Sequence, residues 1–346
     1  DVIVTKDVLD LAKTDEVLEY NSSLADMSVI LYTSGSTGRP KGCILEQGNL
    51  LNFSHWYSNE YNITSSDRGI AYANFSFDAH MMDLYPLLFC GGCIHIIPSS
   101  MRMDMMLLNK YIEENNITIA FLTTQIGAQI VSMFENSSLR LLSVGGEQLP
   151  ALKKPSYPFI NMYGPTECTI GTSFYEVKRD FDNKLIGRPL ANYQLYIVDQ
   201  SLHMVPKGVA GELCVGGAGV SRGYLNRADL TSEKFIELNG SRIYRTGDLV
   251  RWNEDGELEY LGRIDNQVKL RSLRIELGEI ESVMSRYDGI QHAIVDVKKI
   301  GGLQYLCGYY ISDELIEEAD LRDYLLLSLA DYMVPTTFMK LESFPL

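Results

Sequence analysis

The stretch that decides the fold is residues 69–124, "GIAYANFSFDAHMMDLYPLLFCGGCIHIIPSSMRMDMMLLNKYIEENNITIAFLTT". Short apolar runs stand near its start, at its middle and at its end, the first at 69–76 and the last at 117–124. The segments between them, 80–89 and 104–116, have the length and spacing of helices. Because strands that alternate with helices form a parallel sheet covered by helices, we expect an α/β fold with ligand loops at the carboxyl ends of the strands.

The pattern changes twice along the rest of the chain. The alternation extends from Ser28 to about Phe174, and short strands with frequent glycines follow, which is typical of an antiparallel barrel or sandwich. The final part has a small α+β pattern. We therefore expect an α/β part of a large core, a barrel-like part of that core, a hinge and a C-terminal lid, at 1–175, 176–262, 263–267 and 268–346, respectively.

Composition excludes several classes of partner. The 346 residues are 46% hydrophobic and carry a formal charge of −15, which opposes binding to nucleic acid or to an anionic membrane. The first residues lack the basic and then apolar layout of a signal peptide, and the apolar runs are too short for a membrane span. We expect a cytoplasmic protein with reduced thiols.

Cys90 and Cys93, in "CGGC", have the spacing of half a zinc site. No second such pair follows in the sequence, so a turn into a buried strand is the favoured interpretation.

The loop "LYTSGSTGRPKG", residues 31–42, combines hydroxyls, glycines and two cations. Glycines let backbone N–H groups approach a ligand, and Arg39 and Lys41 supply positive charge. The loop differs from the GxxxxGK[ST] phosphate loop, because Pro40 precedes the lysine and no Ser or Thr follows it. Taken alone, it fits a phosphate-binding loop or a flexible turn.

Five motifs follow one another in a fixed order: "YTSGSTGRPKG" (32–42), "NMYGPTE" (161–167), "GELCVGGAGVSRGYL" (211–225), "YRTGDLV" (244–250) and "GRIDNQVKLRSLRIELGEIE" (262–281). In this order they resemble those of the adenylate-forming enzymes, most closely the amino-acid adenylation domains of nonribosomal peptide synthetases. The resemblance runs from about Ser28 to the last residue.

The resemblance implies a reaction, its cofactors and its partners. An amino-acid carboxylate attacks the α-phosphate of ATP, pyrophosphate leaves, and the adenylate passes to the phosphopantetheine thiol of a carrier protein. ATP and Mg²⁺ are implied, as is a peptidyl carrier domain within a larger multidomain synthetase. Such chemistry depends mainly on positioning and on neutralising charge.

At the phosphates, the resemblance implies that the loop wraps the β- and γ-phosphates with Thr33, Ser34, Gly35, Ser36, Thr37, Gly38 and the cation of Lys41. Glu167 would hold Mg²⁺, and Thr166 would donate its hydroxyl near the α-phosphate. A solvated loop carboxylate is the alternative for Glu167.

At the nucleoside, the resemblance implies that adenine stacks on Tyr163 and that Asn161 recognises its edge. Asp248 would accept hydrogen bonds from the ribose, although an Asp that caps a turn is equally natural there. The remaining implied contacts are Gly145, Gly146, Glu147, Gly164, Tyr260 and Arg263. Strand packing is the alternative for Tyr260.

At the amino acid, Asp78 would pair with the ammonium group. Its alternative role is to cap the helix that begins at Ala79, which Ser76 could do instead. The family's pocket positions fall on Asp78, Ala79, Met82, Gln125, Ser143, Gly145, Met162, Ile170 and Gly171. Because Asp78 alone among them is charged and several are small, we predict a medium or large neutral L-amino acid.

The hinge implied by the resemblance is at Asp265. Ser272 stands where the family usually has a glycine, so we expect it to affect thioester formation more than adenylation. Gln47 replaces a histidine often found after the phosphate loop. The family also has a longer region before this loop and a lysine beyond the last residue here, so we expect the chain to belong to a longer polypeptide.

Two other functions remain open on the sequence. The same motifs serve stand-alone ligases that load a dedicated carrier, such as those for D-alanine. A catalytically silent module that binds nucleotide or docks a carrier is the alternative from another class.

Overall fold

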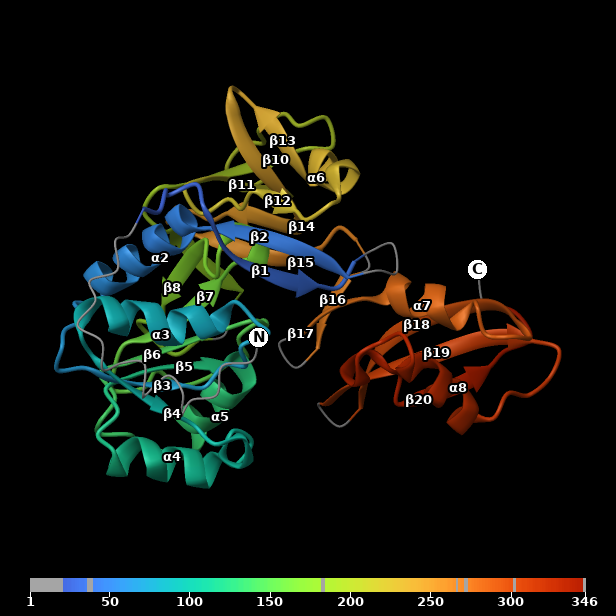
Figure 1. Ribbon diagram of the computed structural model, residues 1–346, viewed down its shortest axis with the longest axis horizontal. Coiled ribbons are helices and arrows are strands. Elements are labelled where there is room, and N and C mark those ends of the chain that lie inside the picture. The colour runs from blue at the N-terminus through green and yellow to red at the C-terminus, as the bar shows by residue number, and fades with distance from the viewer. Residues whose placement is uncertain are drawn as a thin grey trace.

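The computed structural model describes residues 21–35, 40–181, 184–265, 267–270, 273–300 and 303–344. Within these ranges the main element is a mixed sheet of twelve strands (Figure 1). One half of this sheet is parallel and carries helices on both faces. The other half is antiparallel, and a smaller C-terminal unit lies to one side.

The parallel half has the order β4 (Cys93–Ile96), β3 (Arg68–Ala71), β5 (Ile119–Thr123), β6 (Leu141–Gly145) and β7 (Phe159–Tyr163). This confirms the α/β alternation predicted from residues 69–124. Two pairs of helices pack on its faces: α2 (Gln47–Glu60) with α3 (Ala79–Cys90), and α4 (Met105–Glu114) with α5 (Thr124–Met133).

Strand β5 explains why its part of the sequence is an unbroken apolar run. Its residues point alternately to opposite faces of the sheet. Ile119 and Phe121 join the core beneath α2 and α3, whereas Ala120 and Leu122 join the core beneath α4 and α5. A strand covered on both sides therefore has no polar face.

The antiparallel half continues the same sheet beyond β7. Its order is β8 (Ser173–Glu176), β9 (Leu185–Pro189), β15 (Leu258–Arg263), β14 (Ser241–Trp252), β11 (Gly211–Gly217) and β10 (Tyr193–Val198), with β13 (Phe235–Leu238) also paired to β14 and helix α6 (Ala228–Lys234) before β13. The antiparallel pairing predicted for this part of the chain is present. Its strands continue the sheet of the parallel half, because β8 is hydrogen-bonded to β7.

One strand prediction was wrong. Residues 28–34 were expected in the parallel sheet, but β1 (Met27–Thr33) pairs antiparallel with β2 (Lys41–Glu46), which also pairs with β12 (Gly223–Tyr224). The reason is the connection: residues 34–40 are too few for the crossover that parallel neighbours need.

The CGGC stretch forms the turn between α3 and β4. Helix α3 ends at Cys90, Gly91 takes a left-handed conformation with φ of 71°, and β4 begins at Cys93. The buried strand predicted here is wrong, because β4 is the edge strand of the sheet and Ile96 is 78% exposed.

The C-terminal unit begins with the hairpin of β16 (Gln267–Leu270) and β17 (Leu273–Glu276), and continues with α7 (Leu277–Met284), β18 (Ile290–Ile300), β19 (Leu303–Ser312), α8 (Glu318–Leu326) and β20 (Thr337–Lys340). It has its own apolar core, built around Ile280, Met284 and Leu321. In Figure 1 it is orange to red, and the hairpin leads to it from the sheet. Three short 3₁₀ turns complete the described elements: η1 (Ser99–Met101), η2 (Thr166–Cys168) and η3 (Asp331–Met333).

Candidate functional site

A cavity of about 860 Å³ lies where the sheet meets the C-terminal unit. It opens beyond the carboxyl ends of β6 and β7, which is where an α/β sheet binds its ligands. The predicted site residues that line it are Gln125, Gly146, Glu147, Asn161, Met162, Tyr163, Tyr260 and Arg263. Residues that the sequence did not indicate also line it, among them Lys269 from β16 and Lys299 from β18.

Tyr163, Asp248 and Arg263 form one hydrogen-bonded group at this cavity. The Tyr163 hydroxyl donates to one oxygen of Asp248, and Arg263 Nη1 lies 3.0 Å from the other. Burial raises the pKa of Tyr163 well above its usual range, so it stays a donor. The ring of Tyr163 lies near that of Tyr260, with 6.3 Å between their centroids. The structure therefore brings the predicted aromatic, acidic and basic residues together.

Asn161 and the glycine turn after β6 lie on the same side of the cavity. Asn161 is buried, and its Nδ2 donates to the carbonyl of Leu185 at 2.9 Å. Gly146 has a φ of 102°, which side chains other than glycine rarely adopt, so the turn needs a glycine there. Gly164 is constrained by contact, because a Cβ there would lie 2.5 Å from the carbonyl oxygen of Ile170.

Glu167 is the most enclosed charged group of the site. Its side chain is 0% exposed and contacts three polar partners. Lys41 Nζ lies 3.3 Å from Oε1, Arg274 Nη1 lies 2.8 Å from Oε2, and the Tyr224 hydroxyl donates to Oε1 at 2.7 Å. A solvated loop carboxylate, the alternative reading of Glu167, does not fit this burial.

Lys41 and Arg274 keep the carboxyl group of Glu167 ionised. Burial alone would raise the pKa of its carboxyl, but Arg274 and Lys41 outweigh burial and hold that pKa below its usual range. Burial lowers the pKa of Lys41, and the carboxylate of Glu167 opposes that shift. The result is a buried carboxylate that stays ionised with one lysine and one arginine beside it.

The side chains of Asp78, just before α3, and Thr166, in the segment after β7, contact each other. The Thr166 hydroxyl donates to Asp78 Oδ2 at 2.7 Å. Among the described residues, the Asp78 side chain makes no capping hydrogen bond to α3, and Thr166 is its hydrogen-bonding partner instead. Burial raises the pKa of Asp78, which makes a cationic partner favourable for its ionised form.

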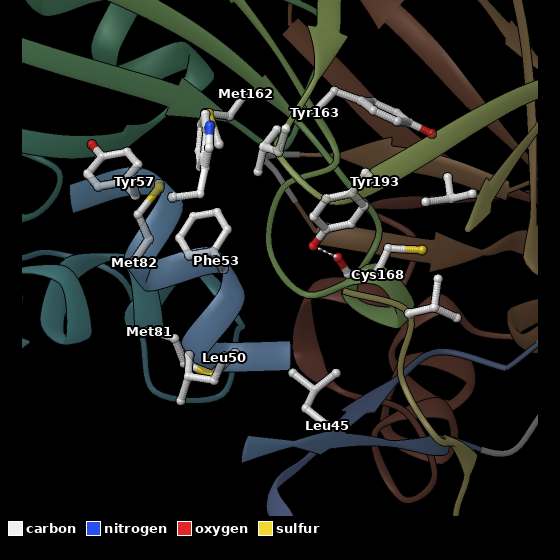
Figure 2. Packing of buried hydrophobic residues seen from close by; sticks show 14 of the residues in the cluster. Leu45, Leu50, Phe53, Tyr57, Met81, Met82, Met162, Tyr163, Cys168 and Tyr193 are labelled. Carbon is white, nitrogen blue, oxygen red and sulfur yellow. Dashed lines mark hydrogen bonds between the residues drawn. The ribbon is translucent and has the colours of Figure 1, made fainter. Parts of the chain in front are cut away.

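The predicted amino-acid pocket is filled by large side chains. Figure 2 shows Tyr57, Phe53, Met82 and Met162 gathered between α2, α3 and β7. A Cβ added to Gly171 would lie 2.6 Å from Met162 Cε and 3.3 Å from Phe53 Cε2. The space that the small residues leave is therefore occupied in this structure, in part by residues of α2 that the sequence did not indicate.

The other pocket positions are divided between this cluster and the open cavity. Ser143 is fully buried, and its hydroxyl lies 3.0 Å from that of Tyr57. Gly145 is buried, Ala79 and Ile170 are half-buried, and Gln125 is exposed at the large cavity.

The predicted phosphate loop, residues 31–42, is described only in part. Thr33 Oγ1 is buried and has no hydrogen-bond partner among the described residues. Ser34 Oγ donates to the carbonyl of Arg274 at 2.9 Å, and the Gly35 N–H donates to Glu279 Oε2 at 3.2 Å. Ser36, Thr37 and Gly38 lie outside the described residues, as does Ser272.

The predicted hinge residue, Asp265, is held by Arg263. Arg263 Nη2 lies 2.6 Å from Asp265 Oδ2, and the backbone N–H of Gln267 donates to Oδ1. The same arginine pairs with Asp248, so the start of the C-terminal unit is tied to the group formed by Tyr163, Asp248 and Arg263.

Sequence reasoning missed several residues of the site. Tyr224 lies in the quoted motif "GELCVGGAGVSRGYL", and Lys269, Arg274 and Glu279 lie in "GRIDNQVKLRSLRIELGEIE". Their types were visible, but no spacing in the sequence shows that these segments reach Glu167 and the phosphate loop. Tyr57 had no signal beyond the apolar face of its helix.

The residues around Glu167 were tested for their fit to a magnesium ion that takes its other ligands from phosphate oxygens and water. Within the described ranges, no group of three or more His, Cys, Asp or Glu residues is placed to hold a metal. Mg²⁺ often uses one or two carboxylates and takes its remaining ligands from phosphate and water. The buried, ionised carboxylate of Glu167 is of the right type, but a metal would have to replace one of its present partners, because Lys41 and Tyr224 contact Oε1 and Arg274 contacts Oε2.

No helix in the part of the chain that the structure describes is long and apolar enough to cross a membrane.

Comparisons with known proteins agree with this geometry. The model of the AMP-binding enzyme family matches residues 4–225. Bacitracin synthase 1 of Bacillus licheniformis is 40% identical over 325 residues, which are 93% of this chain but 6% of that synthase. The structure of PA1221, an NRPS protein containing adenylation and PCP domains, has a TM-score of 0.85 at 27% identity and covers 97% of this chain and 60% of its own. The adenylation domain AlmE of Vibrio cholerae, in complex with glycyl-adenosine-5'-phosphate, also scores 0.85, at 25% identity over 94% of this chain and 65% of its own.

Proposed function

Because the chain belongs to the AMP-binding enzyme family, we propose that it activates an amino acid as aminoacyl-AMP for transfer to a phosphopantetheine carrier. The observation that carries this proposal is the segment that follows β7. Within residues 163–167 it supplies an aromatic ring at the large cavity, a hydroxyl held by Asp78 and a carboxylate held by Lys41. These are the groups that a nucleoside, an amino acid and a polyphosphate would each need.

At the nucleoside end, the ring of Tyr163 and the oxygen of Asn161 would receive the base. The ribose hydroxyls would bond to Asp248, whose present partners are Tyr163 and Arg263. Since both partners are donors, a ribose would add to or replace bonds that already hold the carboxylate in place.

At the phosphate end, a carboxylate oxygen of the amino acid would attack the α-phosphorus, and the bond to the bridging oxygen of pyrophosphate would break. Lys41 would neutralise the leaving oxygens, and Thr166 would donate its hydroxyl near the α-phosphate. Mg²⁺ at Glu167 would supply further positive charge to the phosphate oxygens.

At the amino-acid end, Asp78 would pair with the ammonium group, which would replace the hydrogen bond that it now receives from Thr166 and leave that hydroxyl for the α-phosphate. The walls of the side-chain pocket are neutral, so we propose a neutral side chain. A medium or large one would require Met162 to move away from Gly171, which its flexible thioether permits.

The proposal of a thioester acceptor rests on the proteins to which this chain is similar. Bacitracin synthase 1 is a much longer protein than this chain, and the PA1221 structure contains a PCP domain beside its adenylation domain. We therefore propose that the chain is part of a multidomain synthetase, with a carrier domain as its partner.

ATP–pyrophosphate exchange with a panel of amino acids tests this function. We expect exchange that depends on a neutral amino acid, and Asp78→Asn to reduce it at least about 100-fold with every amino acid. Asp323→Asn is the matched control, because Asp323 lies exposed on α8.

Two results would overturn parts of the proposal. Exchange that depends mainly on Asp, Glu, Lys or Arg would exclude the neutral pocket. Calorimetric binding of ATP with no exchange would favour a nucleotide-binding module without turnover.

A further inference from the structure

Tyr224 lies between two opposite charges at the proposed phosphate end of the site. It is on β12 and is 4% exposed. Its hydroxyl donates to Glu167 Oε1 at 2.7 Å and accepts a hydrogen bond from Lys41 Nζ at 3.1 Å. One hydroxyl therefore joins a buried carboxylate to a buried ammonium group.

The ring of Tyr224 makes a second contact with the same lysine. Lys41 Nζ lies 4.7 Å from the centroid of this ring. The face of an aromatic ring attracts a cation, and the attraction is stronger where water is excluded. Because a lysine side chain is long and flexible, the hydroxyl and the ring together restrict where its ammonium group can lie.

The core fixes the position of Tyr224 itself. Tyr224 pairs with Cys43 of β2, and its backbone N–H donates to Thr231 Oγ1 at 3.0 Å. Its ring packs edge-on against that of Phe235, with 5.4 Å between the centroids and an interplanar angle of 73°. The hydroxyl is therefore presented to Lys41 from a backbone that is held by β2 and α6.

Other buried tyrosines of the chain use their hydroxyl groups differently. Tyr193 donates to the carbonyl of Cys168 at 2.8 Å, and Tyr310 donates to the carbonyl of Ile316 at 3.3 Å. Such bonds join a ring to the backbone. Tyr224 instead bonds to two charged side chains, and hydrogen bonds to charged groups are stronger than neutral ones.

The contacts of Lys41 leave it one donor for a ligand. An ammonium group has three N–H donors. Among the described residues, one serves the Tyr224 hydroxyl and another faces Glu167 Oε1, which is 3.3 Å from Nζ. The direction of the third follows from the first two. A donor that is oriented before the ligand arrives loses less conformational freedom on binding.

We propose that Tyr224 is a positioning residue for Lys41, and that it directs the remaining N–H of this lysine toward the phosphates of ATP. The inference rests on the proposed function, because that function gives Lys41 a phosphate to neutralise. Tyr224 itself touches no phosphate in this account. Its contribution to ATP binding must therefore disappear when Lys41 is absent.

A double-mutant cycle on ATP binding tests this dependence. The variants are Tyr224→Phe, which keeps the ring, Lys41→Met, and both together, and isothermal titration is performed without Mg²⁺. We expect ATP to bind about tenfold more weakly to Tyr224→Phe and about 100-fold more weakly to Lys41→Met. The double variant should match Lys41→Met within about twofold. Tyr310→Phe is the matched control, because it removes another buried tyrosine hydroxyl and should leave ATP affinity unchanged.

Three results would overturn the proposal. Losses that add, to about 1000-fold in the double variant, would show that Tyr224 acts independently of Lys41. An ATP affinity that Tyr224→Phe does not change, or changes no more than Tyr310→Phe does, would show that the hydroxyl positions nothing. A loss that appears only with Mg²⁺ would assign Tyr224 to Glu167 instead.

The pyrophosphate-exchange assay separates these results from the proposed function. A chain that binds ATP without exchange loses the proposed function, and the cycle can still be measured on it. A chain that exchanges but shows additive losses keeps the proposed function and loses this inference. A wild-type chain that binds no ATP loses both.

Nuclear magnetic resonance gives a second readout that does not depend on a Tyr224 variant folding correctly. In wild-type chain with ¹⁵N-labelled lysines, the Lys41 Nζ signal is identified as the one that is absent from Lys41→Met. We expect a nuclear Overhauser effect between its protons and tyrosine ring protons, both before and after ATP is added. Absence of this effect in the ATP complex overturns the proposal.

Discussion

The two ends of the site hold their carboxylates in different ways. At the nucleoside end, Asp248 is held by Tyr163 and Arg263, which come from strands of the same large sheet. At the phosphate end, Glu167 is held by Lys41 and Tyr224 of the core, and also by Arg274 of the C-terminal unit. The first arrangement is complete within the sheet, whereas the second requires both units.

This difference indicates which end responds to movement of the C-terminal unit. Moving the unit would leave Asp248 with both of its hydrogen-bonding partners. It would remove one of the two cations from Glu167 and would free the Gly35 N–H. We therefore infer that the hydrogen bonds of Asp248 persist when the unit moves, whereas those of Glu167 and Gly35 to the unit are lost.

The largest expected effect comes from Glu167→Gln. This change leaves Lys41 and Arg274 buried beside a neutral amide, and loss of one partner from a buried ion pair costs about 3–5 kcal/mol. We expect the free energy of unfolding in urea, followed by tryptophan fluorescence, to fall by about that amount. A variant as stable as the wild type would show that the ion pairs of Glu167 with Lys41 and Arg274 do not contribute to the free energy of unfolding.

A smaller effect is expected at the nucleoside end. Asp248→Asn keeps one acceptor oxygen but turns an NH₂ group toward Tyr163 or Arg263, which are both donors. We expect AMP binding to weaken about 10- to 100-fold and stability to fall by about 1–3 kcal/mol. Asp255→Asn, in the exposed turn between β14 and β15, is the control, and equal AMP affinity in both variants would contradict the ribose role.

A third carboxylate, Asp83, shows what happens without a paired cation, since Arg102 only partly offsets its burial. Its Oδ2 accepts two backbone N–H groups, its Oδ1 has no hydrogen-bond partner among the described residues, and burial raises its pKa to about 8. Between about pH 4 and pH 8 the unfolded chain has lost this proton while the folded chain keeps it, so stability falls as pH rises through that range. We expect Asp83→Asn to remove this part of the pH dependence in urea unfolding. An unchanged slope would show that Asp83 is ionised in the folded protein.

The smallest effect is expected from Tyr57→Phe. The change removes the hydroxyl that lies 3.0 Å from Ser143 and leaves that buried serine without this partner. We expect thermal denaturation to show a loss of about 1 kcal/mol, with no change in AMP binding. Weaker AMP binding would connect this pocket to the nucleoside end.

Local patterns were enough to predict the parallel half of the sheet. Its strands are buried on both faces and its helices alternate with them, so each signal is contained within a few neighbouring residues. Strand β1 could not be assigned in the same way, because its partner depends on the short connection to β2 rather than on its own composition.

The site shows a similar limit. That Tyr163, Thr166 and Glu167 lie near one another could be predicted because they belong to one motif, and their roles remain predictions. The contacts of Arg274 with Glu167 and of Glu279 with Gly35 join segments more than a hundred residues apart. Such contacts depend on how the C-terminal unit packs against the sheet. The periodicity of the sequence does not indicate that packing. The large side chains that fill the pocket, Phe53 and Tyr57, were missed for the same reason.

The most direct test of the central claim is to detect the aminoacyl-adenylate itself. The chain is incubated with ATP, Mg²⁺ and each neutral amino acid, and the products are separated and weighed by mass spectrometry. We expect aminoacyl-AMP and pyrophosphate in equal amounts with at least one neutral amino acid, and at least about 100-fold less of both with Asp78→Asn. Cleavage of ATP that does not depend on an amino acid, or no adenylate from a chain that binds ATP, would contradict it.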